Sequence, residues 1–176
     1  MTKPKNMKEL LDRLIEVTHK ENSYYQDAPV KPMPGKPATQ KELQRLDACL
    51  AKKGLIAPPA YKEFLSIYNG IGHLFDFEFG LLSIQEIVTE NFSFPTWIYK
   101  EAPNLTQFMI AAGNTPAFKV FDSNTPSKGE GYEVVSISPD GDEWRAKNFK
   151  EFLNLMLKGS EGSVKAEEKD RKNLEP

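Results

Sequence analysis

Cysteine is almost absent from this chain: Cys49 is the only one among 176 residues. A disulfide framework and a cluster of thiolate metal ligands are therefore excluded, and the composition fits a reducing cytoplasm, where we expect the protein to reside. Long apolar runs are lacking as well, because no stretch of about 18 apolar residues occurs, so we expect no membrane-spanning helix. Since no apolar run follows the first six residues, we also expect no signal peptide.

An excess of either charge is missing too. The 23 Lys and Arg residues are balanced by 25 Asp and Glu residues, which gives a formal net charge of −2. A general nucleic-acid-binding protein needs a basic face, so the charge balance argues against nucleic acid as the partner. We also expect no binding to membranes.

Histidine is scarce as well, with His19 and His73 the only two. A Cys–His pair of Cys49 and His73 is conceivable, but Cys49 lies in the apolar stripe of a predicted helix, where a thiol is buried and inert. The segment Asp140-Gly141-Asp142-Glu143 has carboxylates without the spacing of a calcium loop, and its pattern is typical of a hairpin turn. We therefore predict no metal site, no cofactor and no catalytic residues.

Two carboxylate pairs permit one further enzymatic hypothesis. Asp76 with Glu78, and Glu86 with Glu90, have the residue types that glycosidases use as acid and base. Alternating or helical spacing places each pair more simply on a solvated strand face or helix face. We accordingly predict a non-enzymatic protein.

Proline is plentiful, with 13 residues, and two of them open the stretch around which the chain is organised. Pro58-Pro59 suits the first turn of a helix, where a missing N–H costs nothing. Apolar residues then recur at i, i+3, i+4 and i+7, which is one helical face. Asn69-Gly70 is expected to end the helix, because both residues tolerate the left-handed conformation. The residues of that face are Tyr61, Phe64, Leu65 and Tyr68.

Four other helices are predicted, and each begins at a recognisable N-terminal cap. The last is expected to end at Gly159, with residues 160–176 too polar to offset their ordering entropy and therefore disordered. The four helices are expected over residues 7–18, 40–53, 84–91 and 149–158, with the caps Asn6–Glu9, Thr39–Glu42, Ser83–Glu86 and Asn148–Glu151.

Strands are predicted where apolar residues alternate or form short runs bounded by turns. Residues 75–79 alternate Phe with acidic residues, which indicates one strand with an apolar and an acidic face. Residues 92–105 have no clean period and are interpreted as an irregular connection with aromatic anchors, and residues 124–131 as a polar loop. The other strands are expected over residues 108–112, 117–121 and 132–138, and around Trp144.

This order of elements predicts an α+β fold, an antiparallel meander sheet with helices packed on one face. Four prolines and a glycine make residues 22–38 an extended connector that cannot be helical. The predicted division is an N-terminal accessory helix (1–21), which docks on the domain or stays detached, then a Pro-rich connector (22–38), a domain (39–158) and a disordered polar tail (159–176).

The central stretch resembles a known family. Its pattern is Pro58, two residues, Tyr61-x-x-Phe64-Leu65, Asn69-Gly70, and then Leu81-x-Ser83-Ile84-x-Glu86-Ile87. This pattern is similar to the signature of the SUKH superfamily of Smi/Knr-type proteins, and the resemblance covers roughly residues 39–158. It implies the same α+β architecture. It also implies the function of an immunity protein that neutralises a cognate bacterial toxin by direct binding, often a nuclease.

The resemblance leaves one alternative open, a regulatory or scaffold protein like the yeast cell-wall regulator of the same superfamily. In either case the candidate partner-binding surface combines acidic charge with aromatic anchors, a combination that suits recognition of a basic protein surface. The two aromatic residues could equally be core residues. The candidate residues are Asp76, Glu78, Glu86, Glu90, Trp97 and Tyr99.

Overall fold

The computed structural model describes residues 4–25, 30–52, 54–75, 79–90, 107–112, 118–127, 131–137 and 144–174. The helices are α1 (Met7–Tyr25), α2 (Gln40–Ala51), α3 (Pro59–Ile67), α4 (Ile84–Glu90) and α6 (Phe149–Leu174). The strands are β1 (Met33–Pro34), β2 (Ile71–Phe75), β3 (Phe79–Leu81), β4 (Gln107–Ala112), β5 (Phe118–Ser127), β6 (Gly131–Ile137) and β7 (Trp144–Ala146).

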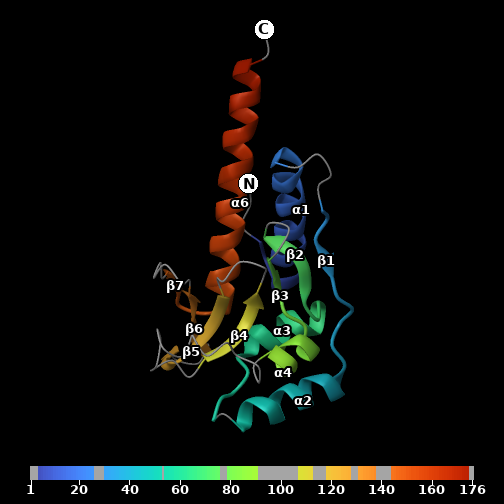
Figure 1. Ribbon diagram of the computed structural model, residues 1–176, viewed down its shortest axis with the longest axis vertical. Helices are drawn as coiled ribbons and strands as arrows, with labels where there is room; N and C mark the ends of the chain where they lie inside the picture. The colour runs from blue at the N-terminus through green and yellow to red at the C-terminus, as the bar shows by residue number, and fades with distance from the viewer. Residues whose placement is uncertain are drawn as a thin grey trace.

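The seven strands form one sheet in the order of the chain, from β1 to β7, and every neighbouring pair is antiparallel. Helices α1, α3, α4 and α6 pack against this meander, and α6 stands beside α1 and rises past the strands (Figure 1). The predicted α+β class with an antiparallel meander sheet is confirmed.

An aromatic cluster holds the helical layer to the sheet. The Tyr61 ring of α3 lies edge-on to Phe121 of β5 and to Phe149 of α6, with centroid distances of 5.1 Å and 5.0 Å. Phe64 packs on Phe149 at 5.4 Å, and Trp144 of β7 stacks on Phe152 of α6 at 5.8 Å. Burial of each large apolar side chain stabilises the fold by about 1.5–3 kcal/mol. The predicted central helix therefore lies at the centre of the core.

All four predicted N-terminal caps are present. The Asn6 Oδ1 accepts from the Glu9 N–H at 2.9 Å, and the Asn148 Oδ1 from the Glu151 N–H at 2.8 Å. Thr39 with Glu42 forms a complete capping box. These side chains satisfy the first N–H groups of their helices, which have no partner within the helix.

The interpretation of residues 75–79 as one strand is wrong. Strand β2 ends at Phe75 and β3 begins at Phe79, and these two residues are paired with each other across the two strands. Phe–acid alternation predicts a continuous strand as readily as a hairpin, because the period of two does not show where the chain reverses.

The polar loop predicted over residues 124–131 is also wrong in its first part. Strand β5 continues to Ser127, which pairs with Gly131, after a register shift between Asp122 and Pro126. Backbone hydrogen bonds along β6 extend the strand whatever the polarity of its side chains. The irregular connection predicted for residues 92–105 lies outside the described residues.

Both terminal helices are longer than predicted. Helix α1 continues to Tyr25, and α6 continues through Gly159 to Leu174, where we predicted disorder. The reason is that the two helices pack on each other, so Ser160 and Val164 are buried against a neighbour that local composition does not reveal. Helix α1 also belongs to the main core through its buried residues Met7, Leu10, Leu11 and Leu14.

Candidate protein-interaction surface

The six residues predicted to bind a partner are only partly described. Glu86 is exposed on the first turn of α4. Glu90 is the last residue of α4, one helical turn further on, and its side chain lies outside the described residues. The remaining four candidates also lie outside the described residues: Asp76, Glu78, Trp97 and Tyr99.

The Glu86 carboxylate is fixed by the start of its own helix. Its Oε2 accepts from the Ser83 N–H and from the Ser83 hydroxyl, both at 2.7 Å, while the Glu86 N–H donates to Ser83 Oγ at 3.3 Å. A negative charge in the first turn also interacts favourably with the helix dipole. Glu86 therefore stabilises α4 and at the same time presents an ordered negative charge to solvent.

Asn69 positions the start of α4 from a distant part of the chain. Its Oδ1 accepts from the Ile84 N–H at 2.8 Å, and its Nδ2 donates to Glu42 Oε1 of α2 at 3.4 Å. Its backbone N–H donates to the Lys36 carbonyl at 3.2 Å. One asparagine thus joins α2, the Pro-rich connector and α4. The sequence indicated only that Asn69 ends a helix.

Two glycines allow the backbones to meet at this point. Gly70 has φ of 88°, and a Cβ there would lie 2.7 Å from the Ser83 nitrogen. A Cβ on Gly35 would lie 2.3 Å from the Asn69 carbonyl oxygen. Positive φ and such close approach both favour glycine. The Asn69-Gly70 pair therefore fixes where Glu86 sits relative to α2.

Helix α2 contributes more charged groups beside α4. Arg45 donates to the Gln85 Oε1 at 2.8 Å, and Lys62 of α3 forms an ion pair with Asp47 at 2.7 Å. Hydrogen bonds from the side chain and backbone of Thr39 lower the pKa of Glu42. Helices α2 and α3 therefore carry charges of both signs, and Arg45 joins α2 to the first turn of α4.

A groove lies between α1 and α6, and the sequence did not predict it. It has a volume of about 740 Å³ and is floored by Val17 and Val164 and bordered by charged side chains of both helices. It was missed because residues 160–176 were predicted to be disordered. Its charged border consists of Lys8, Glu9, Asp12, Arg13, Glu16, Lys20, Glu161, Lys165 and Glu168.

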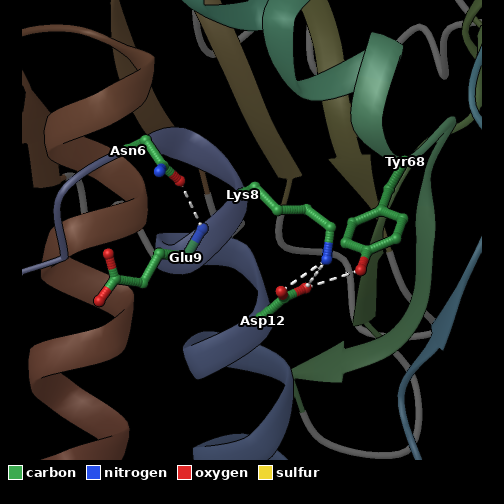
Figure 2. Close-up of polar contacts among 5 residues, drawn as sticks. All are labelled: Asn6, Lys8, Glu9, Asp12 and Tyr68. Carbon is green, nitrogen blue, oxygen red and sulfur yellow. Dashed lines mark hydrogen bonds and ion pairs between the residues drawn. The ribbon is translucent and has the colours of Figure 1, made fainter.

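Polar contacts also tie the start of α1 to the end of α3 (Figure 2). The Tyr68 hydroxyl donates to Asp12 Oδ1 at 2.6 Å, and Lys8 Nζ donates to the same atom at 2.7 Å. Lys8 also lies over the Tyr68 ring, 5.2 Å from its centroid. Burial of Asp12 raises its pKa, but the hydrogen bonds from Lys8 and Tyr68 outweigh that effect, so the pKa is lowered.

A cluster of three charged side chains lies on strands β5, β6 and β7. Arg145 of β7 forms ion pairs with Asp122 of β5 at 2.9 Å and with Glu133 of β6 at 3.2 Å. The Asp122 side chain is only 3% exposed, whereas Arg145 is 42% exposed. A buried carboxylate needs such a partner, so the contact links three neighbouring strands.

Residues considered for catalysis or metal binding are placed as follows. Cys49 is buried in α2, as predicted for an inert thiol. His73 is half-buried on β2, with φ of 55°. Within the described ranges, no three His, Cys, Asp or Glu side chains gather in a way that could hold a metal ion. Nor is any described helix both long and apolar enough to cross a bilayer.

The seven-stranded antiparallel meander, the Pro58-initiated helix and the Asn69-Gly70 turn define an α+β protein of the SUKH type. The chain belongs to the SMI1 / KNR4 family (SUKH-1), whose family model matches residues 37–155. The resemblance seen in the sequence is thereby confirmed. Comparison with curated proteins gave no match. The match includes α2 and the first part of α6, whereas α1 and the rest of α6 lie outside it.

Proposed function

We propose that the protein is a non-enzymatic binding domain of the immunity type, which neutralises a cognate bacterial toxin by direct contact. Membership of the SMI1 / KNR4 family is the observation that supports this proposal. Neutralisation would follow from covering the active site or the substrate groove of the toxin. If the toxin is a nuclease, its groove is basic because it holds a polyanion, and acidic side chains are complementary to it.

We place the partner surface at the acidic residues around α4 and at the two aromatic residues that follow. Glu86 supports this placement, because it is exposed and its carboxylate is held in one orientation by Ser83. Ordered charges at the border of an interface raise the association rate, and buried aromatic residues supply most of the affinity. The proposed residues are Asp76, Glu78, Glu86, Glu90, Trp97 and Tyr99.

A regulatory or scaffold role of the Smi/Knr type is the second candidate function. The observation that favours it is the pair of α1 and the distal part of α6, which lies outside the family match and borders a separate groove. Such an additional surface suits a protein that brings partners together.

Affinity capture followed by an inhibition assay separates the two functions. The purified chain is used to capture proteins from cells and secreted material of its source. Each captured protein is then assayed for toxicity and nuclease activity with and without one equivalent of the chain. Abolition of a toxin's activity at one equivalent supports the immunity function. A captured protein that is not toxic and that binds without loss of its activity favours the scaffold role.

Charge substitutions test the proposed surface. Glu86→Gln removes the charge but keeps an acceptor for the capping box, so α4 is preserved. Combined with Asp76→Lys, Glu78→Lys and Glu90→Lys, it should slow association with the captured toxin by roughly 10- to 100-fold at low salt. Stopped-flow kinetics at low and moderate salt measure the effect, and circular dichroism checks the fold.

A matched control reverses three exposed carboxylates elsewhere, Glu16, Glu63 and Asp170, each to Lys. This variant changes the net charge by nearly the same amount and should change the association rate far less. Equal slowing of both variants would mean that only total charge matters, and the binding surface would have to be sought elsewhere.

A further inference from the structure

Helices α1 and α6 pack side by side and run in the same direction. Arg13 forms an ion pair with Glu161, and seven residues further along both helices Lys20 forms one with Glu168. At the far end, Arg171 lies 4.6 Å from the centroid of the Tyr24 ring. Because these contacts follow the same order in both helices, the pair is parallel, with ion pairs one heptad apart.

The packing of this pair changes along its length. At the base, α1 contributes buried leucines and α6 contributes Phe149, Phe152 and Leu153, all completely buried. Further along, the buried residues are Thr18, Asn22, Ser160 and Val164, of which only Val164 is apolar. The Thr18 hydroxyl is buried there without a hydrogen-bond partner among the described residues. The distal part of the interface therefore gains less from apolar burial than the base does.

The change in packing coincides with two glycines in α6. A Cβ added at Gly159 or at Gly162 would meet no atom within 4 Å, so close packing does not require glycine at either position. Glycine in a helix interior disfavours the helix roughly fivefold relative to alanine. The intrinsically weakest part of α6 thus lies between its apolar base and its polar distal half.

We propose that residues 160–174 form a latch on α1, which opens as a unit at Gly159–Gly162 while the base of α6 stays packed. Besides the burial of Val164, the latch is closed by Arg13–Glu161, Lys20–Glu168 and Arg171–Tyr24. The Lys20–Glu168 pair is exposed, so closure of the latch depends on ionic strength. A polar segment of this length is marginal as an isolated helix, so it loses its helical hydrogen bonds when it leaves α1. Opening uncovers the face of α1 that carries Thr18 and Asn22.

Amide hydrogen exchange of the full-length chain, followed residue by residue by NMR, tests the latch. Amides of residues 163–174 should exchange with one common protection factor, at least tenfold lower than that of residues 152–157. Raising the salt from about 0.05 to 0.5 M should speed exchange a few-fold in the distal segment and not in the base. A profile that declines smoothly toward the C-terminus, without a step at 159–162, would overturn the hinge.

Two sets of variants test the glycine hinge and the Lys20–Glu168 ion pair of the latch. Gly159→Ala with Gly162→Ala should slow distal exchange roughly tenfold or more, whereas Lys150→Ala at the base leaves it unchanged. Lys20→Glu places two negative charges together and should speed amide exchange in the distal segment. Adding Glu168→Lys re-forms an ion pair and should return the exchange rate to that of wild type. Exchange that is uniform from 149 to 174 and insensitive to salt and to Lys20→Glu would show that α6 is a single rigid element.

Discussion

At the residue scale, Asn69 joins three segments that are far apart in the sequence. Its side chain contacts Ile84 and Glu42, and its backbone contacts Lys36. The sequence predicted the helix end at this residue, because Asn-Gly has a local conformational preference. It did not predict the side-chain contacts, because those depend on where the other two segments lie in space.

Asn69→Ala should lower the free energy of unfolding by about 1–3 kcal/mol, because the Ile84 N–H loses its acceptor in a partly buried site. Urea denaturation measures the change. Asn154→Ala is the control, since that side chain bonds only to Lys150 in its own helix at an exposed position, and it should stay within about 0.5 kcal/mol of wild type. Equal stabilities of the two variants would contradict the role given to Asn69.

Tyr61 is a second residue whose effect on stability follows from the groups around its side chain. Its ring is buried among Phe64, Phe121 and Phe149, but its hydroxyl has no hydrogen-bond partner among the described residues. Because an unpaired buried hydroxyl costs free energy, Tyr61→Phe should raise the free energy of unfolding by about 1 kcal/mol. Thermal unfolding at neutral pH measures this. A loss of stability would show that the hydroxyl has a partner.

The same residue predicts a change at alkaline pH. Burial, and secondarily the charge of Glu86, raise the pKa of Tyr61 well above its ordinary value of 10.0. A raised pKa in the folded state means that stability is complete below pH 10 and falls as pH rises above it, because the unfolded chain ionises first. Tyr61→Phe should therefore lose less stability than wild type between about pH 10 and 11 in denaturant titrations.

At the scale of elements, the first half of α6 could be predicted from the sequence and its distal half could not. The apolar spacing from Phe149 to Leu157 predicted its first half, and the Asn148 cap predicted its first residue. Its distal half was missed because Val164 is the only apolar residue between Ser160 and Leu174 that is buried, and the partner that buries it is α1. Local composition carries no information about a contact between the two ends of a chain.

Truncation after Gly159 should lower the melting temperature by roughly 3–12 °C and leave the fold intact. Loss of Val164 burial is worth about 1.5–3 kcal/mol, the exposed Lys20–Glu168 pair adds little, and a chain of this size loses about 2–4 °C per kcal/mol. Calorimetry measures the shift, and truncation after Leu174 is the control that should not move it. An unchanged melting temperature after removal of 160–176 would mean that the distal helix adds no stability.

At the scale of the whole molecule, the order of the elements was sufficient to predict the fold class. Strand after strand pairs with its neighbour in sequence, so the meander follows from the positions of apolar runs and turns. The partner surface is different, because the sequence does not show whether its six residues lie close together in space. Of its members, Glu86 is the one whose side chain the structure places.

The family-matched region should not fold without α1. Met7, Leu10, Leu11 and Leu14 are buried in the main core, and losing about 6–12 kcal/mol of burial is comparable with the stability of a whole domain. A fragment of residues 30–158 should show poor NMR dispersion and bind a hydrophobic dye, and adding a peptide of residues 1–28 should reverse both. A fragment that melts cooperatively by itself would show that α1 is dispensable.

The packing of α1 on α6 also delays folding during synthesis, because α1 is made long before α6. Lys20 and Glu168, which meet in the folded protein, are 148 residues apart in the chain. At translation rates of about 5–20 residues per second, the leucine face of α1 leaves the ribosome roughly 7–30 s before the helix that covers it. During that interval Leu10, Leu11 and Leu14 lack the part of their burial that α6 supplies, and the nascent chain offers an apolar helix to chaperones. Helices α1 and α6 can pack on each other only after residues 149–174 have left the exit tunnel.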